Sequence, residues 1–462
     1  MVLRIVYDGE ERLVTLGEKT RIYDAIIKSG IPFDAQCGGH GKCLKCLVKA
    51  FGNLSEKTEK EKDLIEGERL ACESFILGDA TIIIDNKDEI KEEKSLKEFI
   101  TVTDLGTTTI EVKAFYDNGT EAFGYSFKNP LISYGADVIT RAEAFPKGTS
   151  DAEKILKNTI ENEEKAHGIK AKKRYFVGNT MMLHFLTGKD VKGFGTYPFE
   201  VESLFGFEDE FGYYFGCASA FIGADVIAAA VSKGIGEGGS ALIVDVGTNT
   251  EMILFDGKKF YACSAPAGPA FEGSEIKYGK RAENGAIYDV FFEDGGIKCK
   301  TVGNEKPTGI CGSGLLAFCH ALYKGGYVSF DGTPIKEFPS FDGITVTPED
   351  AAKFLTAKAA IRSGIDTLLN AAGIEKVDEF YIAGNFGSGL DLKKAFETGM
   401  FPSALEDKAK AVGNAALKGA CLAAFDKEKA ALIKKIAKET EVTELANDTF
   451  FAENFIKNIR FI

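Results

Sequence analysis

The sequence lacks any stretch that is long and apolar enough to be expected to span a membrane as a helix. Its first residues lack the basic segment and long apolar core of a signal peptide, so a cytoplasmic location is expected. Dense runs of lysine and arginine are also missing, and the formal net charge is −13. Because nucleic acid binding requires basic residues that neutralise phosphates, the sequence disfavours a nucleic acid partner, and it gives no sign of a membrane partner.

Histidine is scarce, with four residues in 462. A histidine-ligated iron–sulfur cluster needs two histidines, so His40, inside a Cys-rich loop, is interpreted as a loop residue and not as a ligand. The ten cysteines are not expected to form a disulfide framework in a long chain without a signal peptide. Six of them have no ligand spacing and are interpreted mainly as buried thiols: Cys217, Cys263, Cys299, Cys311, Cys319 and Cys421.

The other four cysteines follow the spacing Cys37-x5-Cys43-x2-Cys46, with Cys72 after 25 further residues. A [2Fe–2S] cluster takes four thiolate ligands, and three on one loop require that loop to wrap closely around the cluster. The loop contains three glycines, which allow such a path because they tolerate positive φ angles and add no bulk. Zinc is the alternative, but zinc sites usually pair two Cys-x2-4-Cys units, and one is present here. The pattern therefore predicts a [2Fe–2S] cluster.

This segment resembles the adrenodoxin-like [2Fe–2S] ferredoxins, which share the x5 and x2 spacing and an ending like Arg69-Leu70-Ala71-Cys72. The surrounding pattern predicts strands at 3–7 and 12–16, a helix over 20–29 capped by Thr20, and later strands at 46–51 and 80–84. This order suits a β-grasp domain over residues 1–85. The charged stretch 86–98 is interpreted as a linker.

The rest of the chain contains an internal repeat. Thr101–Thr109 and Leu242–Thr250 are both apolar strands that end in Asp-x-Gly-Thr-x-Thr, and each continues into a second β-rich run. The repeat predicts a duplicated mixed α/β fold over residues 99–462, with lobes at about 99–240 and 241–462. We expect two such lobes to leave a cleft between them, where a ligand can bind.

The repeated motif has a chemical use at the end of a strand. Glycine lets backbone N–H groups approach phosphate oxygens, threonine hydroxyls donate to them, and an aspartate can hold Mg²⁺ directly or through water. Asp104 and Asp245 are the candidate catalytic carboxylates, with Glu251 and Glu272 as weaker candidates. The candidate phosphate-binding residues are Gly106, Thr107, Thr108, Gly247, Thr248 and Asn249.

Two further Gly-rich turns are candidates for nucleotide contact. One opens an apolar helix at Gly312 and Ser313, and the other follows an apolar strand at Gly384, Asn385 and Gly387. A plain structural turn is an equally good interpretation of each alone. Taken together, residues 101–430 resemble the ATPase superfamily of actin and the sugar and acetate kinases. The resemblance implies that the repeated motifs are the two phosphate loops and that Gly384–Gly387 is the adenosine loop.

Four further segments narrow the resemblance to the ATP-dependent reductive activators of corrinoid proteins: Ser133–Arg141, Val177–Met182, Ala267–Gly273 and Val412–Ala416. A [2Fe–2S] domain fused to this ATPase is that family's arrangement. The resemblance implies the cofactors [2Fe–2S], ATP and Mg²⁺. It also implies one-electron reduction of cobalt(II) to cobalt(I) on a corrinoid protein, fed by a low-potential electron donor, and it allows a homodimer.

Better-known activators of this type have a middle domain between the ferredoxin domain and the ATPase. The sequence is interpreted as a short form in which only the charged stretch 86–98 separates these two domains. One alternative is an activator of another low-potential metalloenzyme. A second is a redox- or nucleotide-sensing binding protein that turns over little ATP. A third is a small-molecule kinase in which Asp245 activates a hydroxyl group.

Overall fold

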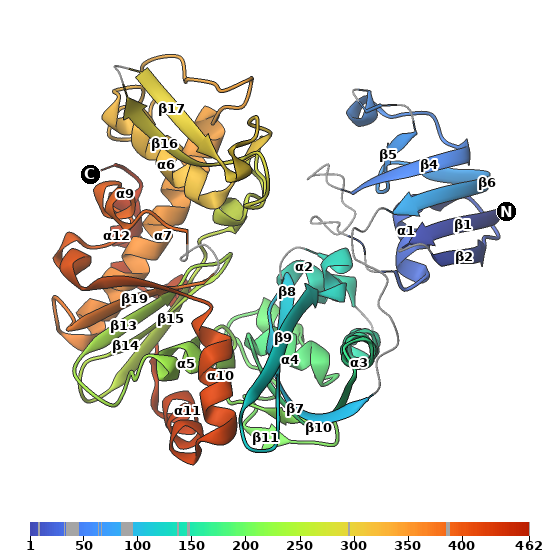
Figure 1. The fold of residues 1–462 in the computed structure, drawn as a ribbon. Coiled ribbons are helices and arrows are strands. Elements are labelled where there is room, and N and C mark those ends of the chain that lie inside the picture. Colours follow the sequence, from blue (N-terminus) through green and yellow to red (C-terminus); the bar gives the residue numbers. More distant parts are fainter. Residues whose placement is uncertain are drawn as a thin grey trace. The chain divides into compact units, whose positions relative to one another are not determined.

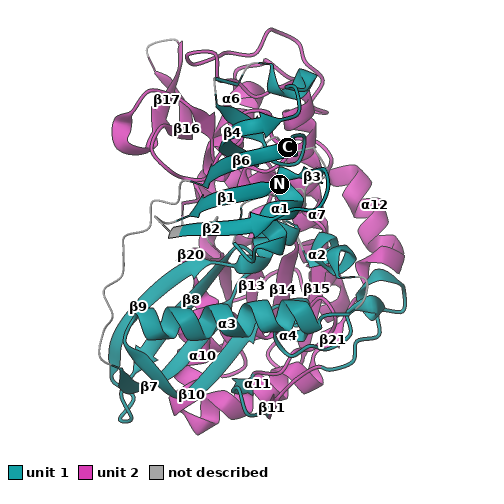
Figure 2. Cartoon of the chain, turned by 90° about the vertical axis from the view of Figure 1, so that its right-hand side faces the viewer, with its two compact units in different colours: residues 1–203, 208–214 teal, residues 204–207, 215–462 magenta. Residues whose placement is uncertain are grey.

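The structure is a computed structural model that forms two compact units (Figure 2). Unit 1 contains residues 1–203 and 208–214, and unit 2 contains residues 204–207 and 215–462. The structure describes residues 1–7, 10–31, 33, 46–62, 64–65, 67–84, 96–135, 138–145, 148–293, 296–384 and 389–461.

The first sheet of unit 1 has the order β2-β1-β6-β4-β5, with β3 paired to β6 (Figure 1). Apolar side chains of this sheet and of α1 form one buried cluster that includes Leu3, Ile26 and Ile82. This mixed sheet with one helix agrees with the predicted β-grasp domain. The elements are β1 (Val2–Tyr7), β2 (Glu10–Thr15), β3 (Thr20–Arg21), α1 (Ile22–Lys28), β4 (Leu47–Leu54), β5 (Glu68–Leu70) and β6 (Phe75–Ile84).

The helix predicted over 20–29 begins later than expected. Thr20 and Arg21 pair with β6 as a short strand, and Arg21 is the N-cap of α1. The predicted cap, Thr20, instead donates its hydroxyl hydrogen to the carbonyl of Glu18 at 2.9 Å. Pairing with β6 therefore takes precedence over local capping at this point.

The second sheet of unit 1 has the order β11-β12-β10-β7-β8-β9. The last two residues of the predicted linker, Lys97 and Glu98, belong to β7, because they pair with β10 and Lys170 binds the Glu98 carboxylate at 2.9 Å. The elements are β7 (Lys97–Leu105), β8 (Thr109–Phe115), β9 (Glu121–Lys128), α2 (Val138–Ala144), α3 (Ser150–Ala166), β10 (Ile169–Gly178), α4 (Thr180–Leu186), β11 (Phe207–Glu208) and β12 (Tyr213–Tyr214).

The main sheet of unit 2 has the order β20-β19-β13-β14-β15-β21. As in the second sheet of unit 1, three successive antiparallel strands are followed by a parallel partner of the first, which confirms the predicted duplication. The elements are α5 (Ala224–Ser232), β13 (Ala241–Asp245), β14 (Thr250–Phe255), β15 (Phe260–Ala265), α7 (Pro348–Ala372), β19 (Glu379–Ala383), β20 (Ala409–Gly413), α10 (Ala415–Phe425), α11 (Lys427–Glu439), β21 (Glu441–Val442) and α12 (Thr449–Asn458).

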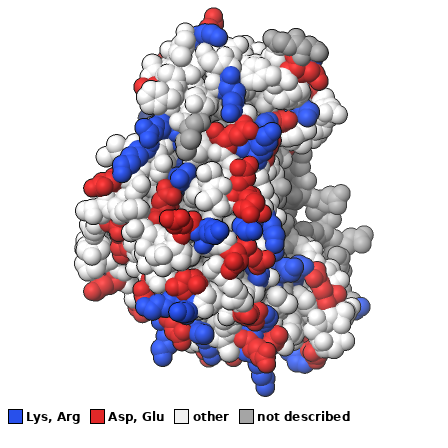
Figure 3. Space-filling view, turned by 90° about the vertical axis from the view of Figure 1, so that its left-hand side faces the viewer, with Lys and Arg blue, Asp and Glu red and all other residues white. Residues whose placement is uncertain are grey.

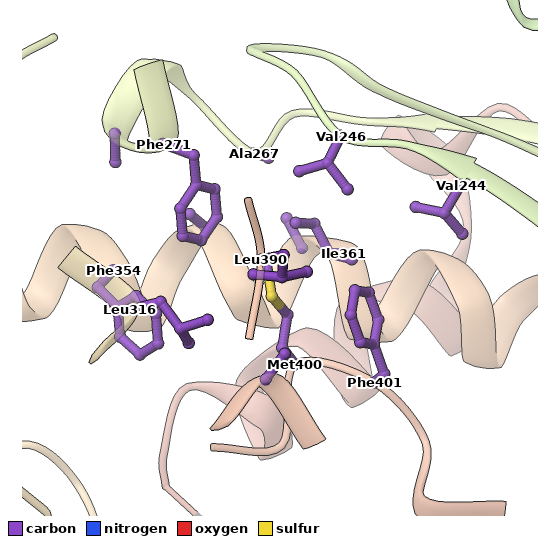
Figure 4. Packing of buried hydrophobic residues seen from close by; sticks show 14 of the residues in the cluster. Val244, Val246, Ala267, Phe271, Leu316, Phe354, Ile361, Leu390, Met400 and Phe401 are labelled. Carbon is purple, nitrogen blue, oxygen red and sulfur yellow. The ribbon is translucent and has the colours of Figure 1, made fainter. Parts of the chain in front are cut away.

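The strands of this sheet are buried on both faces. Val244 and Val246 belong to a large apolar cluster that includes Ile361 of α7 (Figure 4). Successive side chains on a strand point to opposite faces, so Ile243 and Asp245 project to the other side. That side is packed by α5, which lies beside α10 (Figure 1). The alternation therefore directs the side chain of Asp245 toward α5.

A smaller sheet of unit 2, in the order β17-β16-β18, packs against α6. It consists of β16 (Ala286–Glu293), β17 (Gly296–Thr301) and β18 (Gly309–Ile310), with α6 at Gly312–Lys324. On the face drawn in Figure 3, basic and acidic side chains alternate over the surface. In the ranges that the structure describes, no helix is long and apolar enough to cross a membrane.

Candidate functional site

Two of the four predicted cluster ligands lie side by side in unit 1. Cys46 and Cys72 are both buried, and their sulfur atoms are 3.1 Å apart. The backbone N–H of Cys72 also donates to Cys46 Sγ at 3.4 Å, a contact of the kind that tunes an iron–sulfur cluster. Cys37 and Cys43 lie outside the described residues. The described thiols therefore fit a shared metal centre, because they converge without a disulfide between them.

The segment that carries Cys72 is held by a buried carboxylate that the sequence did not reveal. Glu61 accepts hydrogen bonds from Arg69 Nε at 3.1 Å, from Leu70 N–H at 2.8 Å and from Ser74 Oγ at 2.7 Å. Although burial opposes ionisation, these hydrogen bonds, with Arg69 foremost, lower the pKa of Glu61 to about 2. Glu61 therefore stays ionised and holds Leu70 and Ser74, which lie two residues before and two residues after Cys72.

The first predicted phosphate loop follows β7. Asp104, the next-to-last residue of this strand, lies directly opposite Glu111 on β8, and Gly106 begins the tight turn between the two strands. A side chain at Gly106 would place its Cβ 2.4 Å from the carbonyl oxygen of Thr109. The sequence predicted the aspartate and the glycine but not Glu111. Its position opposite Asp104 is the counterpart of Glu251 in the second repeat.

Three side chains donate hydrogen bonds to residues of this first loop. Arg141 donates to the carbonyl of Thr107 at 2.6 Å, and Asn129 donates its amide hydrogen to the carbonyl of Gly106 at 2.7 Å. The amide of Asn179 donates to Thr107 Oγ1 at 3.2 Å. Sequence reasoning missed these roles, although Arg141 and Asn179 stand in two of the segments that carried the family resemblance. The contacts explain those segments as supports of the loop.

The second predicted loop joins β13 to β14 in unit 2. Asp245 ends β13 directly opposite Glu251 on β14, so both carboxyl groups project from the face that α5 covers. The first turn of α5 carries Asp225, which the sequence analysis did not select. Carboxylates directly opposite one another destabilise a sheet. A cation or a shared proton would reduce the repulsion between them.

The electrostatics of these three carboxyl groups are strongly coupled. Burial, together with the charge of Asp225, raises the pKa of Asp245 to about 7. Burial and the charges of Asp225 and Asp245 raise the pKa of Glu251, and burial raises the pKa of Asp225. The site therefore resists ionising all three groups together, as carboxyl groups at catalytic or cation sites commonly do. No group of three or more ligands with metal-binding geometry occurs within the described ranges.

The predicted adenosine loop begins beside Asp245. Gly384 has a φ of 91°, and a side chain there would place its Cβ 2.7 Å from Asp245 Oδ1 and 2.8 Å from the carbonyl oxygen of Val246. Its N–H donates to the carbonyl of Gly413 at 3.2 Å, next to Asn414, the N-cap of α10. The tertiary structure thus brings Gly384 and the second predicted phosphate loop together. Asn385 and Gly387 lie outside the described residues.

A further contact is made by the second predicted phosphate loop itself. Glu272 Oε1 accepts hydrogen bonds from the N–H of Thr248 at 2.9 Å and from Thr248 Oγ1 at 2.6 Å. Gly247 and Asn249 flank this residue, and a Cβ at Gly247 would lie 3.9 Å from the same oxygen of Glu272. Glu272, a weaker candidate from the sequence, is therefore part of the loop's immediate surroundings.

Gly312 and Ser313 form the first residues of α6, after the N-cap Cys311. Ser313 Oγ lies 3.3 Å from Cys311 Sγ. A Cβ at the neighbouring Gly314 would lie 1.9 Å from the carbonyl oxygen of Ile287. Close packing of α6 on β16 accounts for the glycine here, and nucleotide contact by Gly312 and Ser313 stays a prediction.

Two family models match consecutive parts of the chain. The model for the RACo middle region matches residues 100–237, and the model for the C-terminal domain of RACo, the ASKHA domain, matches residues 239–462. The interpretation of the chain as a short form without a middle domain is therefore wrong. Its middle region carries the same Asp-x-Gly-Thr-x-Thr motif as the second lobe, and that repeat led residues 99–240 to be assigned to the ATPase alone.

Several known proteins resemble this chain. The corrinoid activation enzyme RamQ of Eubacterium limosum is 25% identical over an alignment 590 residues long, gaps included, and the alignment covers 99% of each chain. A [Co(II) methylated amine-specific corrinoid protein] reductase of Methanosarcina barkeri is 32% identical over 188 residues, 35% of each chain. The 2Fe-2S ferredoxin-5 of Aquifex aeolicus is 31% identical over 77 residues, 14% of this chain and 80% of the ferredoxin.

One solved structure shares the fold over almost the whole chain. A reductive activator for corrinoid, iron–sulfur protein superposes with a TM-score of 0.68 at 24% sequence identity. The match covers 99% of this chain and 98% of the other. The similarity in fold therefore extends over the N-terminal sheet as well as over the residues that the two family models match.

Proposed function

We propose that this chain, which belongs to the RACo family by the two models that match residues 100–237 and 239–462, is an ATP-dependent activator that reduces cobalt(II) in a corrinoid protein to cobalt(I). The observation that carries the proposal is the presence in one chain of two converging buried thiols and a duplicated sheet whose repeated Asp-x-Gly-Thr-x-Thr motif follows the first strand of each copy. Relatives that resemble it are named for corrinoid activation and for reduction of a Co(II) corrinoid protein.

Cys37, Cys43, Cys46 and Cys72 are the residues that would hold the [2Fe–2S] cluster. When bound, the cluster supplies one-electron transfer at a potential near −400 mV for an all-cysteine plant-type site. Glu61 and the N–H of Cys72 order the described ligands, and burial keeps water from the two sulfur atoms. The electron donor is proposed to be a low-potential carrier.

ATP has a thermodynamic role in this proposal. Reduction of a cobalt(II) corrinoid generally requires a potential below that of the cluster, and each 60 mV uphill costs roughly 1.4 kcal/mol for one electron. Nucleotide can offset this cost only if it binds two conformations of the protein with different affinity. The phosphate loops are the elements through which such a difference would act.

In unit 2, the N–H groups of Gly247 to Asn249 and the hydroxyl of Thr248 are proposed to bind phosphate oxygens. Asp245 is proposed to hold Mg²⁺ directly or through water, which suits the usual magnesium site of one or two carboxylates completed by phosphates. Asp225 and Glu251 would keep a proton or orient water beside it, because burial and the neighbouring carboxylates disfavour the ionisation of all three groups. Further proposals are a cytoplasmic location and a second copy of the chain as partner.

The test is a reduction assay with the full chain, a low-potential reductant and a purified Co(II) corrinoid protein. We expect Co(I) absorbance to appear only with ATP. Cys72→Ser should abolish both the cluster chromophore and the reduction, whereas Cys421→Ser, at a half-buried thiol outside the cluster segment, should leave both unchanged. Cobalt reduction that is independent of ATP would refute the proposal, as would failure with several corrinoid proteins from the neighbourhood of the gene.

A further inference from the structure

The segment Ala267–Gly273 contacts the second phosphate loop at both of its ends. Near its start, the N–H of Gly268 donates to the carbonyl of Thr248 at 2.9 Å. Near its other end, the carboxylate of Glu272 accepts from the N–H and from the hydroxyl of the same threonine. One short segment therefore engages three polar groups of Thr248.

The backbone of this segment is firmly placed. Pro269–Glu272 forms a 3₁₀ turn between Gly268 and Gly273, whose φ angles are 75° and 74°. A Cβ at Gly273 would lie 2.6 Å from the carbonyl oxygen of Lys280. Phe271 is buried and meets Phe354 edge-on, with ring centroids 6.0 Å apart (Figure 4). The side chain of Glu272, in contrast, is exposed and can turn away from the loop without moving this core.

The two donors that Glu272 occupies are the kind of donors that bind phosphate at a Gly-Thr loop. A carboxylate and a phosphate are both anions, and charge-assisted hydrogen bonds to either are stronger than neutral ones. One N–H cannot serve both acceptors fully. In addition, Glu272 places a negative charge near Glu251. A bound phosphate would be repelled by that charge if Glu272 stayed in place.

We infer that Glu272 occupies the phosphate position of the second loop when no nucleotide is bound, and that a nucleotide phosphate displaces it from Thr248. The inference rests on the proposed function, because it assumes that this loop binds phosphate. Glu272 acts as a positioning residue: it keeps the loop in shape in the nucleotide-free chain and lowers the apparent affinity for nucleotide by competition. Binding then releases a carboxylate at the surface of the 3₁₀ turn Pro269–Glu272.

The first test measures affinity. A non-hydrolysable ATP analogue is titrated by calorimetry into the full chain loaded with its cluster. Glu272→Gln keeps the shape of the side chain but removes its charge. Because charge-assisted hydrogen bonds are about twice as strong as neutral ones, we expect about fivefold tighter binding. The matched control is Glu275→Gln, at an exposed carboxylate three residues away, which should bind within about twofold of the parent protein.

The second test separates competition from a purely structural role. Without nucleotide, Glu272→Gln should lower the melting temperature, because a contact of the free loop is weakened. With saturating analogue the difference from the parent chain should vanish, because that contact is absent from the bound state. If Glu272→Gln does not fold, Glu272→Asp serves instead, since its shorter side chain withdraws the carboxylate but keeps the charge.

The outcomes distinguish this inference from the proposed function. If the parent chain binds the analogue but Glu272→Gln binds it equally or more weakly, the displacement is refuted and the proposed function stands. A melting-temperature difference that persists at saturation also refutes the displacement. If the parent chain binds no nucleotide, both the inference and the proposed function fail.

Discussion

Replacing Asp245 by asparagine should stabilise the nucleotide-free protein while it removes nucleotide-dependent activity. Asp245 faces Glu251 across the sheet and Asp225 at the start of α5, and burial with the charge of Asp225 raises its pKa to about 7. A carboxyl group whose pKa is raised by folding holds its proton more tightly in the folded chain. The folded chain therefore loses stability as the pH rises from about 4, where unfolded aspartate ionises, to about 7.

The size of the effect follows from this change in pKa. One pKa unit corresponds to about 1.4 kcal/mol, so a rise from 3.8 to about 7 sets an upper limit of about 4 kcal/mol at pH 8. Asp245 is half-buried, and contact with water reduces the effective penalty. We therefore expect Asp245→Asn to raise the free energy of unfolding by about 2 kcal/mol at pH 8, by less than about 1 kcal/mol at pH 5 and by nothing measurable at pH 3.5.

Chemical denaturation of the nucleotide-free full chain at these three pH values measures the effect on unit 2. The matched control is Asp256→Asn, on the turn between β14 and β15. Asp256 accepts hydrogen bonds from the N–H groups of Lys258 and Lys259 at 2.7 and 2.8 Å, which help to lower its pKa. Its amide variant should be equally or less stable than the parent chain at pH 8.

The reasoning would be refuted by an Asp245→Asn variant that is less stable than the parent chain at pH 8, or by a gain that does not change with pH. Either result would mean that the carboxylate is stabilised by partners and not strained by its neighbours. ATP turnover of the same variant provides the functional half of the test, and it should fall at least tenfold if Asp245 holds the cation as proposed.

Three further predictions follow from the supports of the two sites. Glu61→Gln should cost about 3 kcal/mol, because it leaves Arg69 buried without its charge partner, and should reduce cluster loading measured by visible absorbance. Since the pKa of Glu61 is lowered to about 2, its stabilisation should be lost in the parent chain as the pH falls from about 4.5 to 2, and equal stability of parent and variant at pH 7 would contradict this. Gly384→Ala should weaken nucleotide binding at least tenfold by calorimetry, because its φ is 91° and its Cβ would lie 2.7 Å from Asp245, whereas Gly389→Ala, with open space around its Cβ, should bind normally. Arg141→Lys should destabilise unit 1 by about 2 kcal/mol and weaken nucleotide binding, because one ammonium group cannot replace the guanidinium contacts to both Gly135 and Thr107. An unchanged denaturation midpoint and an unchanged nucleotide affinity would show that these contacts stabilise neither the unit nor the loop.

The sequence predicted the features that depend on local spacing. Four cysteines with x5 and x2 intervals indicated one cluster, since a loop that wraps a cluster needs its ligands and glycines at short, fixed distances. The repeated Asp-x-Gly-Thr-x-Thr motif indicated two related sheets, because a strand followed by a tight turn is encoded within a dozen residues. The same repeat misled the assignment of the middle region, since the motif occurs on both sides of the boundary between the two family models.

Only the tertiary structure revealed the partners of these motifs. Asp225 is twenty residues before Asp245 and belongs to a helix, and it reaches the carboxyl pair because strand alternation turns Asp245 toward α5. Arg141 and Asn129 support the first loop from a helix and from the end of β9, and Glu272 meets Thr248 because Gly268 and Gly273 turn the chain back. No local pattern encodes such contacts, because they depend on which faces and ends of separate elements the fold brings together.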